Sequence, residues 1–141
     1  MSVTTWDAQR EDDPRIPNSE DMYRRVIGDF VLRRQDSGSK VLSSQAFSDP
    51  YGEVSVDRSS LISPEGCLAL GDVRHLGVVA VTAGQARQLQ QIVVWDPIPE
   101  NRAHALICGK RQETGSARKR IAKKLAKTAR WVYPEDRNPF T

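Results

Sequence analysis

Short apolar blocks separated by polar turns run through the middle of this chain. Residues 76–81 form a continuous apolar run rich in valine, which predicts a buried strand. Residues 90–95 and 103–108 have the same character, and the loop between them holds Pro97 and Pro99. Because proline has no N–H to give to a sheet ladder, this loop must leave the sheet. We predict that the two segments form a wide hairpin at the centre of the domain. The expected core residues are Val79, Val81, Val93, Leu106 and Ile107.

The first third of the chain contains shorter patterns. Apolar residues at positions 22, 23, 26 and 27 predict a helix that Asn18 or Ser19 caps and Gly28 ends. Residues 30–33 predict a short strand. Residues 44–48 and 53–57 flank the turn sequence Asp-Pro-Tyr-Gly, and this arrangement predicts a β-hairpin.

Two capping signals predict short helices further along. Ser63, followed by Pro64 and Glu65, has the residue types of an N-cap, a first helical position and an acidic first turn. That helix should end near Leu70. Thr82 should cap a second helix over residues 83–89.

The strongest pattern lies near the C-terminus. Ser116 is a good cap, and alternating apolar and basic residues with helical spacing follow it. The apolar face consists of Ala117, Ile121, Ala122, Leu125, Ala126, Ala129 and Val132. Pro134 prevents continuation of the helix. We therefore predict one long helix that reaches about residue 132.

These elements predict an α+β fold in which a small, mainly antiparallel sheet packs against the long basic C-terminal helix, with one or two short helices at its edges. At 141 residues the chain has the size of one domain. We expect a flexible arm over residues 1–18, because that stretch is polar and charged. After this arm we expect a single domain over residues 19–133 and a tail over residues 134–141.

Charge is distributed unevenly along the chain. Between residues 110 and 130 there are nine basic residues and one acid, which leaves 12 basic and 17 acidic residues elsewhere. The formal net charge of +3 therefore combines a block of +8 with a remainder of −5. Such an asymmetry suggests an electrostatic partner for the C-terminal segment, either nucleic acid or an acidic protein.

The basic face of the predicted helix is the first candidate site. Clustered lysine and arginine side chains neutralise phosphates and release counterions. Trp131 and Tyr133 follow the charges and could stack on a base. The expected nucleic-acid-binding residues are Arg118, Lys119, Arg120, Lys123, Lys124, Lys127 and Arg130. The alternative is a solvated helix face that keeps the protein soluble.

A second candidate site is a small hydrolase or transferase centre around His104 and Arg24. The segment from His104 to Gly109 is similar to the histidine segment of papain-like hydrolases, with Cys67 as the nucleophile that this comparison implies. The alternative for His104 is a structural histidine bonded to the loop backbone, and Cys67 by itself suits a buried core position.

Arg24 and Arg25, with Arg58 and the serines at 43 and 44, could instead form an anion site. The order Arg24, Ser43-Ser44, Glu53 is similar to the pattern with which ADP-ribosyltransferases bind a nicotinamide dinucleotide, but the paired-acid motif is missing. The ordinary alternative is pairing of these arginines with nearby aspartates.

Metal-binding, cofactor-binding and membrane-bound classes of protein have little support in the sequence. His75 and His104 are far apart, no CxxC or HExxH motif occurs, and no glycine-rich phosphate loop is present, so we expect no metal and no cofactor. No apolar run approaches the roughly 20 residues that cross a bilayer, so we expect no membrane partner. Without a signal-peptide pattern, Cys67 and Cys108 should be free thiols in the cytoplasm.

Four short motifs resemble those of a group of small uncharacterised bacterial proteins. They are Tyr23-Arg24-Arg25, Ser43-Ser44-Gln45-Ala46-Phe47, Ser55-Val56-Asp57-Arg58 and the proline loop that ends in Ala103-His104-Ala105. The resemblance implies a single-domain bacterial cytoplasmic protein and carries no catalytic residue. Together with the charge pattern, it leads us to expect a non-enzymatic binding module that serves as a small subunit of a bacterial assembly.

Overall fold

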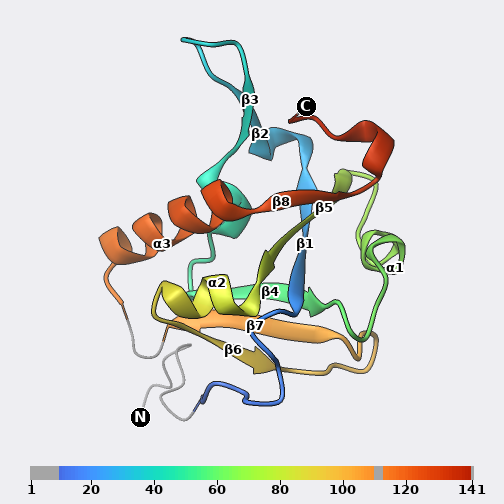
Figure 1. Ribbon diagram of the computed structural model, residues 1–141, viewed down its shortest axis with the longest axis vertical. Coiled ribbons are helices and arrows are strands. Elements are labelled where there is room, and N and C mark those ends of the chain that lie inside the picture. Colours follow the sequence, from blue (N-terminus) through green and yellow to red (C-terminus); the bar gives the residue numbers. More distant parts are fainter. Residues whose placement is uncertain (1–9, 110–112, 141) are drawn as a thin grey trace.

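The computed structural model describes residues 10–109 and 113–140 and confirms the α+β prediction. A six-stranded antiparallel sheet has the order β6-β7-β4-β1-β5-β8, and β2 and β3 form a separate two-stranded hairpin (Figure 1). The strands are β1 (Asp21–Ile27), β2 (Val31–Arg33), β3 (Lys40–Leu42), β4 (Glu53–Arg58), β5 (His75–Thr82), β6 (Gln91–Trp95), β7 (His104–Gly109) and β8 (Arg130–Tyr133). The helices are α1 (Pro64–Ala69), α2 (Ala83–Gln88) and α3 (Gly115–Thr128), with 3-10 turns η1 (Gly28–Phe30), η2 (Ser44–Phe47) and η3 (Glu135–Arg137).

The sheet separates two apolar clusters. The larger one contains the buried face of α3 together with α2, η2 and one face of the sheet. The smaller one lies on the other face, where Cys67 of α1 packs with Tyr23, Val78 and Ala80. All five residues predicted for the core are buried. The sheet therefore holds α3 on one side and α1 on the other.

Residues 21–27 form strand β1, so the helix predicted there is wrong. Met22 and Val26 face the larger cluster, whereas Tyr23 faces the smaller one. A spacing of four residues places side chains on one face of a helix, but it is also an even number and gives one face of a strand. Seven residues of β1 pair with β5, and this long-range pairing decides the conformation.

Two further expectations need correction. Residues 44–47 form the 3-10 turn η2 rather than a strand, because the Ser43 hydroxyl caps it by accepting from the N–H of Gln45. The turn at 49–52 and strand β4 are as predicted. The β6–β7 hairpin also forms as predicted, but it was expected at the centre of the domain, whereas β6 is an edge strand of the sheet.

The C-terminal helix is the longest helix, but it is shorter than predicted. The cap is Thr114, and the helix ends at Thr128 because Ala129 adopts an extended conformation. Residues 130–133 then form β8, which pairs with β5 and directs Val132 toward the smaller apolar cluster. The predicted tail continues into η3, and Phe140 packs against Trp131 with 6.1 Å between ring centroids.

The described part of the predicted arm, residues 10–18, lies against the sheet. Ile16 is 1% exposed, and the N–H of Asp13 donates to the carbonyl of Val93 over 2.9 Å. The guanidinium of Arg15 lies 5.2 Å from the ring centre of Trp95. Residues 1–9 lie outside the described residues, and the mobility expected of the arm stays a prediction.

Candidate functional site

A basic groove lies where α3, the β2–β3 hairpin and β8 meet. It has a volume of about 560 Å³. Its cationic lining residues are Arg34, Lys40, Lys123, Lys127 and Arg130. The apolar part consists of Val41, Leu42, Ala126, Ala129, Trp131 and Phe140, and Ser44 and Asn138 complete the described lining. No acidic side chain belongs to this described lining.

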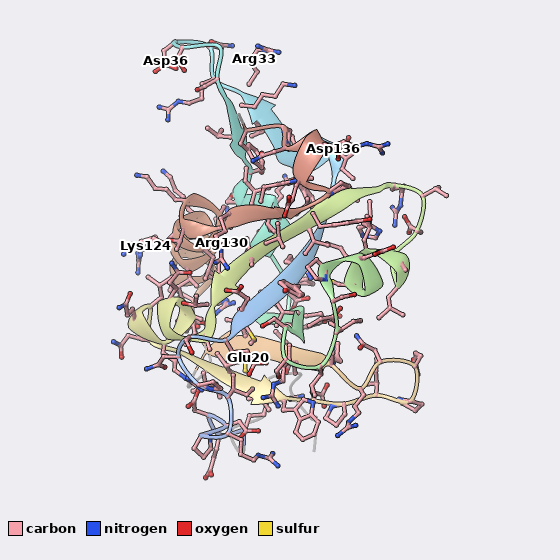
Figure 2. All side chains as sticks on the ribbon, turned by 45° about the vertical axis from the view of Figure 1, so that its right-hand side comes forward. Glu20, Arg33, Asp36, Lys124, Arg130 and Asp136 are labelled. Carbon is pink, nitrogen blue, oxygen red and sulfur yellow. The ribbon has the colours of Figure 1, made fainter. Side chains whose placement is uncertain are left out.

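Helix α3 positions the groove because its two faces differ. Ile121, Ala122, Leu125 and Ala126 are buried against the sheet and η2. The basic residues between them therefore face outward, and Figure 2 shows Lys124 extending away from the body of the protein. This arrangement places Lys123 and Lys127 beside the hairpin, where they line the groove.

The β2–β3 hairpin forms the opposite wall and projects from the rest of the molecule (Figure 1). The N–H of Arg34 donates to the carbonyl of Ser39 over 2.7 Å and closes the loop. Gly38 has a φ of +71°, a conformation that glycine adopts without a steric penalty. The tip carries both Arg33 and Asp36, and the Asp36 carboxylate lies 3.4 Å from Arg34 (Figure 2).

The lysines of the groove have no ion-pair partner among the described residues. Arg34 pairs with Asp36 and Arg130 pairs with Asp21, whereas Lys40, Lys123 and Lys127 make no such contact within the described part of the chain. All three lysines are exposed. Unpaired ammonium groups on mobile stems are available to an external anion.

The structure divides the seven residues predicted for nucleic-acid binding. Lys119, Arg120, Lys123, Lys124 and Lys127 lie on the exposed face of α3. Arg118 instead turns inward and donates to the side chains of Gln91 (2.7 Å) and Glu113 (2.8 Å). Arg130 lies in β8 rather than on the helix, and it reaches the groove from the other side. Lys110 and Arg111 of the basic block lie outside the described residues.

His104 lies at the start of β7 between Asp96 and Ser55. Its Nδ1 is 2.9 Å from the backbone oxygen of Asp96 and 3.2 Å from the Asp96 carboxylate. Because both of these oxygens only accept hydrogen bonds, Nδ1 carries the proton. In the neutral ring Nε2 is then an acceptor, and the Ser55 hydroxyl, 3.2 Å away, donates to it. The bond to loop backbone agrees with the structural role considered for His104.

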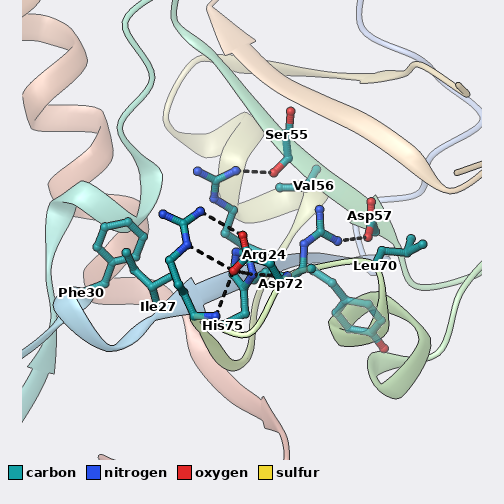
Figure 3. A pocket seen from close by; sticks show the side chains of 13 residues that line it. Arg24, Ile27, Phe30, Ser55, Val56, Asp57, Leu70, Asp72 and His75 are labelled. Atoms are coloured by element: carbon teal, nitrogen blue, oxygen red, sulfur yellow. Dashed lines mark hydrogen bonds and ion pairs between the residues drawn. The ribbon is translucent and has the colours of Figure 1, made fainter. Parts of the chain in front are cut away.

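Arg24 reaches the same serine from another strand. Its Nε donates to the carbonyl of Ala46 and its Nη1 to the carbonyl of Ser55, each over 2.8 Å. Arg24 lines a polar cleft between β1 and β4, and Ser55 lines it too (Figure 3). Ser55 therefore connects Arg24 with His104, a link that no pattern in the sequence predicted. The one sequence feature that could have indicated this role is the position of Ser55 between Val54 and Val56 in the alternating apolar and polar pattern of strand Glu53–Arg58.

Cys67 does not pair with His104. The Cys67 thiol lies 3.6 Å from Nη1 of Arg25, and that same nitrogen donates to the carboxylate of Asp57 over 2.9 Å. Burial raises the pKa of Cys67 to about 12, and the nearby Asp57 carboxylate contributes to this rise. A thiol of this kind is protonated at neutral pH, so it lacks the thiolate that a cysteine nucleophile needs.

The other proposed anion-binding residues are distributed over separate contacts. Ser43 caps η2, Ser44 lines the basic groove and Glu53 lies 3.4 Å from Arg10. Arg58 forms a buried bidentate pair with Glu20 over 2.9 and 3.0 Å. Of this set, Arg24 and Arg25 alone line the cleft. The pattern shared with ADP-ribosyltransferases is therefore not gathered in one pocket.

Residues 10–109 and 113–140 contain no cluster of three histidine, cysteine, aspartate or glutamate side chains that could hold a metal ion. None of the described helices combines the length and apolar character that crossing a membrane requires. Comparison of the chain with protein-family models, with curated proteins and with solved structures gives no match in any of the three.

Proposed function

We propose that this protein binds nucleic acid through the basic groove between α3, the β2–β3 hairpin and β8. The observation that carries the proposal is the composition of the groove: five cations, an apolar floor with two aromatic rings, and no acid among its described lining residues. Cations of this kind contact phosphates, and the apolar floor suits sugar and base faces.

The proposal concerns binding rather than chemistry in the groove. The described lining contains Ser44 and three lysines, but no histidine, cysteine or carboxylic acid lies among them to activate a nucleophile. Phosphate contacts also carry no sequence information, so DNA and RNA of many sequences should bind. Such a module would act in the cytoplasm as a small subunit of a bacterial assembly.

Three substitutions within the groove test this proposal. Changing Lys40, Lys123 and Lys127 together to glutamine removes the three unpaired charges, and all three side chains are exposed, so folding should persist. Because every phosphate that loses its cation weakens binding, we expect retention on single-stranded DNA or RNA to fall by about tenfold or more at about 100 mM salt. Fluorescence anisotropy with a labelled oligonucleotide measures the change.

A second triple variant, confined to α3, serves as the matched control. Changing Lys119, Arg120 and Lys124 to glutamine removes the same formal charge from α3, but none of these residues lines the groove. A smaller decrease in affinity for this variant supports the groove. An equal decrease would show that the whole basic face binds instead.

Binding measurements on the native protein distinguish a nucleic-acid partner from an acidic protein partner. If no oligonucleotide binds even at about 50 mM salt, where such contacts are strongest, the proposal is wrong. Binding of polyglutamate under those same conditions, without binding of an oligonucleotide, would indicate an acidic protein as the partner.

A further inference from the structure

The sheet splits between its two central strands. β1 pairs with β4 only through Met22 and Tyr23, opposite Arg58 and Asp57, whereas it pairs with β5 along its whole length. Beyond Tyr23 the two strands separate, and a cleft of about 490 Å³ opens beside the split. This volume is within the range of about 300–1,000 Å³ typical of small-molecule sites.

Arg24 projects into the split as a cation without a counter-ion among the described residues. Two carbonyls, those of Ala46 and Ser55, accept from its Nε and Nη1, and no carboxylate of the described residues lies within ion-pair distance. Asp49 is the acid that influences Arg24, but its carboxylate already accepts the N–H groups of Tyr51 and Glu53. Carbonyl dipoles hold the guanidinium in place without neutralising it.

The charge on Arg24 is costly in this position. Burial lowers the pKa of Arg24, and the neighbouring charge of Arg25 lowers it further. No hydrogen bond joins its Nη2 to another group in the described part of the chain. Nη2 is also open to solvent, because the only fully buried side-chain nitrogen or oxygen atoms without a hydrogen bond among the described residues are Nε of Arg10 and Oε1 of Glu53, which form an ion pair with each other. A half-buried cation with free N–H groups at a cleft can be stabilised by an anion from outside.

The other charges of the cleft are already paired. Arg25 pairs with Asp57 over 2.9 Å, and Arg74 pairs with Asp72 over 2.9 Å. Figure 3 shows these pairs around the cleft, with Arg24 bound to Ser55 between them. Among the described lining residues one uncompensated positive charge therefore remains, and it belongs to Arg24.

His75 adds a neutral donor to the wall. The N–H of Asp72 donates to Nδ1 of His75 over 2.9 Å, so Nδ1 has no proton and Nε2 carries it in the neutral ring. The His75 ring and the aliphatic stem of Arg25 both lie close to Gly71. A Cβ at position 71 would be 2.6 Å from Nδ1 of His75 and 2.8 Å from Cδ of Arg25. Gly71 thus allows both side chains to line the cleft.

Apolar side chains complete the lining. Ile27, Phe30, Val56 and Leu70 line the cleft together with these polar groups. A site with one uncompensated arginine and an apolar wall favours a ligand that has an anionic head and an apolar body.

We propose that the cleft between β1 and β4 binds a small organic oxyanion, with its phosphate or carboxylate group on Arg24 and its apolar body against Ile27, Phe30 and Leu70. This site is separate from the basic groove and does not depend on the groove binding nucleic acid. Phosphate and carboxylate share the planar, bidentate recognition that a guanidinium provides.

Calorimetric titration of the native protein tests the proposal with four probes: phenyl phosphate, benzoate, inorganic phosphate and phenol. We expect one or both aromatic anions to bind more tightly than inorganic phosphate, and phenol not to bind. The comparison of phenyl phosphate with benzoate identifies the head group. Absence of binding by both aromatic anions at millimolar concentration overturns the proposal, and so does equal binding of phenol.

Substitution of Arg24 localises the binding. Arg24→Gln should weaken binding of the aromatic anion by about tenfold or more, because it removes a charge-assisted hydrogen bond. Arg102→Gln removes the same charge from an exposed position that does not line the cleft, and it should leave binding unchanged. Unchanged binding in a folded Arg24→Gln variant overturns the proposal.

Chemical-shift mapping on the native protein covers the case in which Arg24→Gln does not fold. Addition of the aromatic anion should shift backbone amide signals of residues 24–27, 55–57 and 71–75. Shifts restricted to α3 and residues 34–42 would place the anion in the basic groove and overturn the proposal. The groove triple variant should still bind the aromatic anion, so failure of one site is distinguishable from failure of the other.

Discussion

The basic groove and the cleft between β1 and β4 both collect positive charge, but they hold it differently. In the groove the lysines are exposed and unpaired among the described residues, on side chains with many rotamers. In the cleft Arg24 is fixed by two carbonyls, and Arg25 and Arg74 are fixed by carboxylates. Mobile exposed cations follow a long polyanion whose phosphates vary in position, whereas fixed guanidinium groups favour one small ligand geometry.

Because of this difference, we expect substitutions in the groove and in the cleft to have different effects on binding and stability. Lysine side chains of the groove contact solvent, so removing their charge should alter binding and leave stability unchanged. Arginine side chains at the cleft satisfy backbone carbonyls, so removing them affects packing as well as binding. Three measurements test how far this contrast holds.

The largest expected effect concerns the thiol behind the cleft. With a pKa raised to about 12 by burial, Cys67 should react with iodoacetamide at pH 8 about a thousandfold more slowly than in the unfolded chain, because so little thiolate is present. Peptide mapping by mass spectrometry measures the modification, and the protein in denaturant is the control. Fast alkylation of native Cys67 would show that the structure around Arg25, which lines the cleft and contacts Cys67, opens readily instead of being fixed.

The next effect is salt dependence. With about three phosphates neutralised by the unpaired lysines of the groove, the affinity for single-stranded nucleic acid should fall about twentyfold between about 50 and 200 mM salt. Binding of an aromatic anion to the cleft involves one uncompensated charge, so it should weaken only about two- to threefold over the same range. Anisotropy and calorimetry measure the two slopes. Equal slopes would remove the distinction between the sites.

The smallest effect compares two basic residues of the same helix. Arg118→Gln leaves the buried Gln91 side chain without its donor and should lower the free energy of unfolding by about 1–3 kcal/mol, with little change in nucleic-acid affinity. Lys123→Gln should leave stability within about 0.5 kcal/mol and weaken the affinity a few-fold. Denaturant unfolding and anisotropy measure both. The opposite assignment of the two effects would contradict the described positions of these side chains.

Local signals in the sequence were sufficient for the elements that depend on neighbouring residues. Ser63 and Thr82 cap α1 and α2 as predicted, because a cap is a bond between side chain and backbone two or three residues apart. The valine-rich strand and the β6–β7 hairpin followed from apolar runs and a proline loop. Local signals failed for β1 and for residues 44–47, where spacing alone allowed more than one conformation.

The candidate site was predictable in its chemistry but not in its arrangement. The sequence marked the exposed lysines of α3, together with His104 and Arg24. It did not indicate that the β2–β3 hairpin supplies Arg34 and Lys40 to the groove, because these residues are about 80 positions away from α3 in the chain. Ser55 was also missed, since its bonds to Arg24 and His104 span 31 and 49 positions.

By itself, then, the sequence determined the α+β class, the basic C-terminal helix, the capped short helices and the uneven distribution of charge. These depend on composition, on periodicity and on contacts between near neighbours. Only the tertiary structure decided that residues 21–27 are a strand, that Arg118 turns inward, and that β1 and β4 separate. Each of these depends on pairing between distant segments, and the free energy of such pairing is absent from any local pattern.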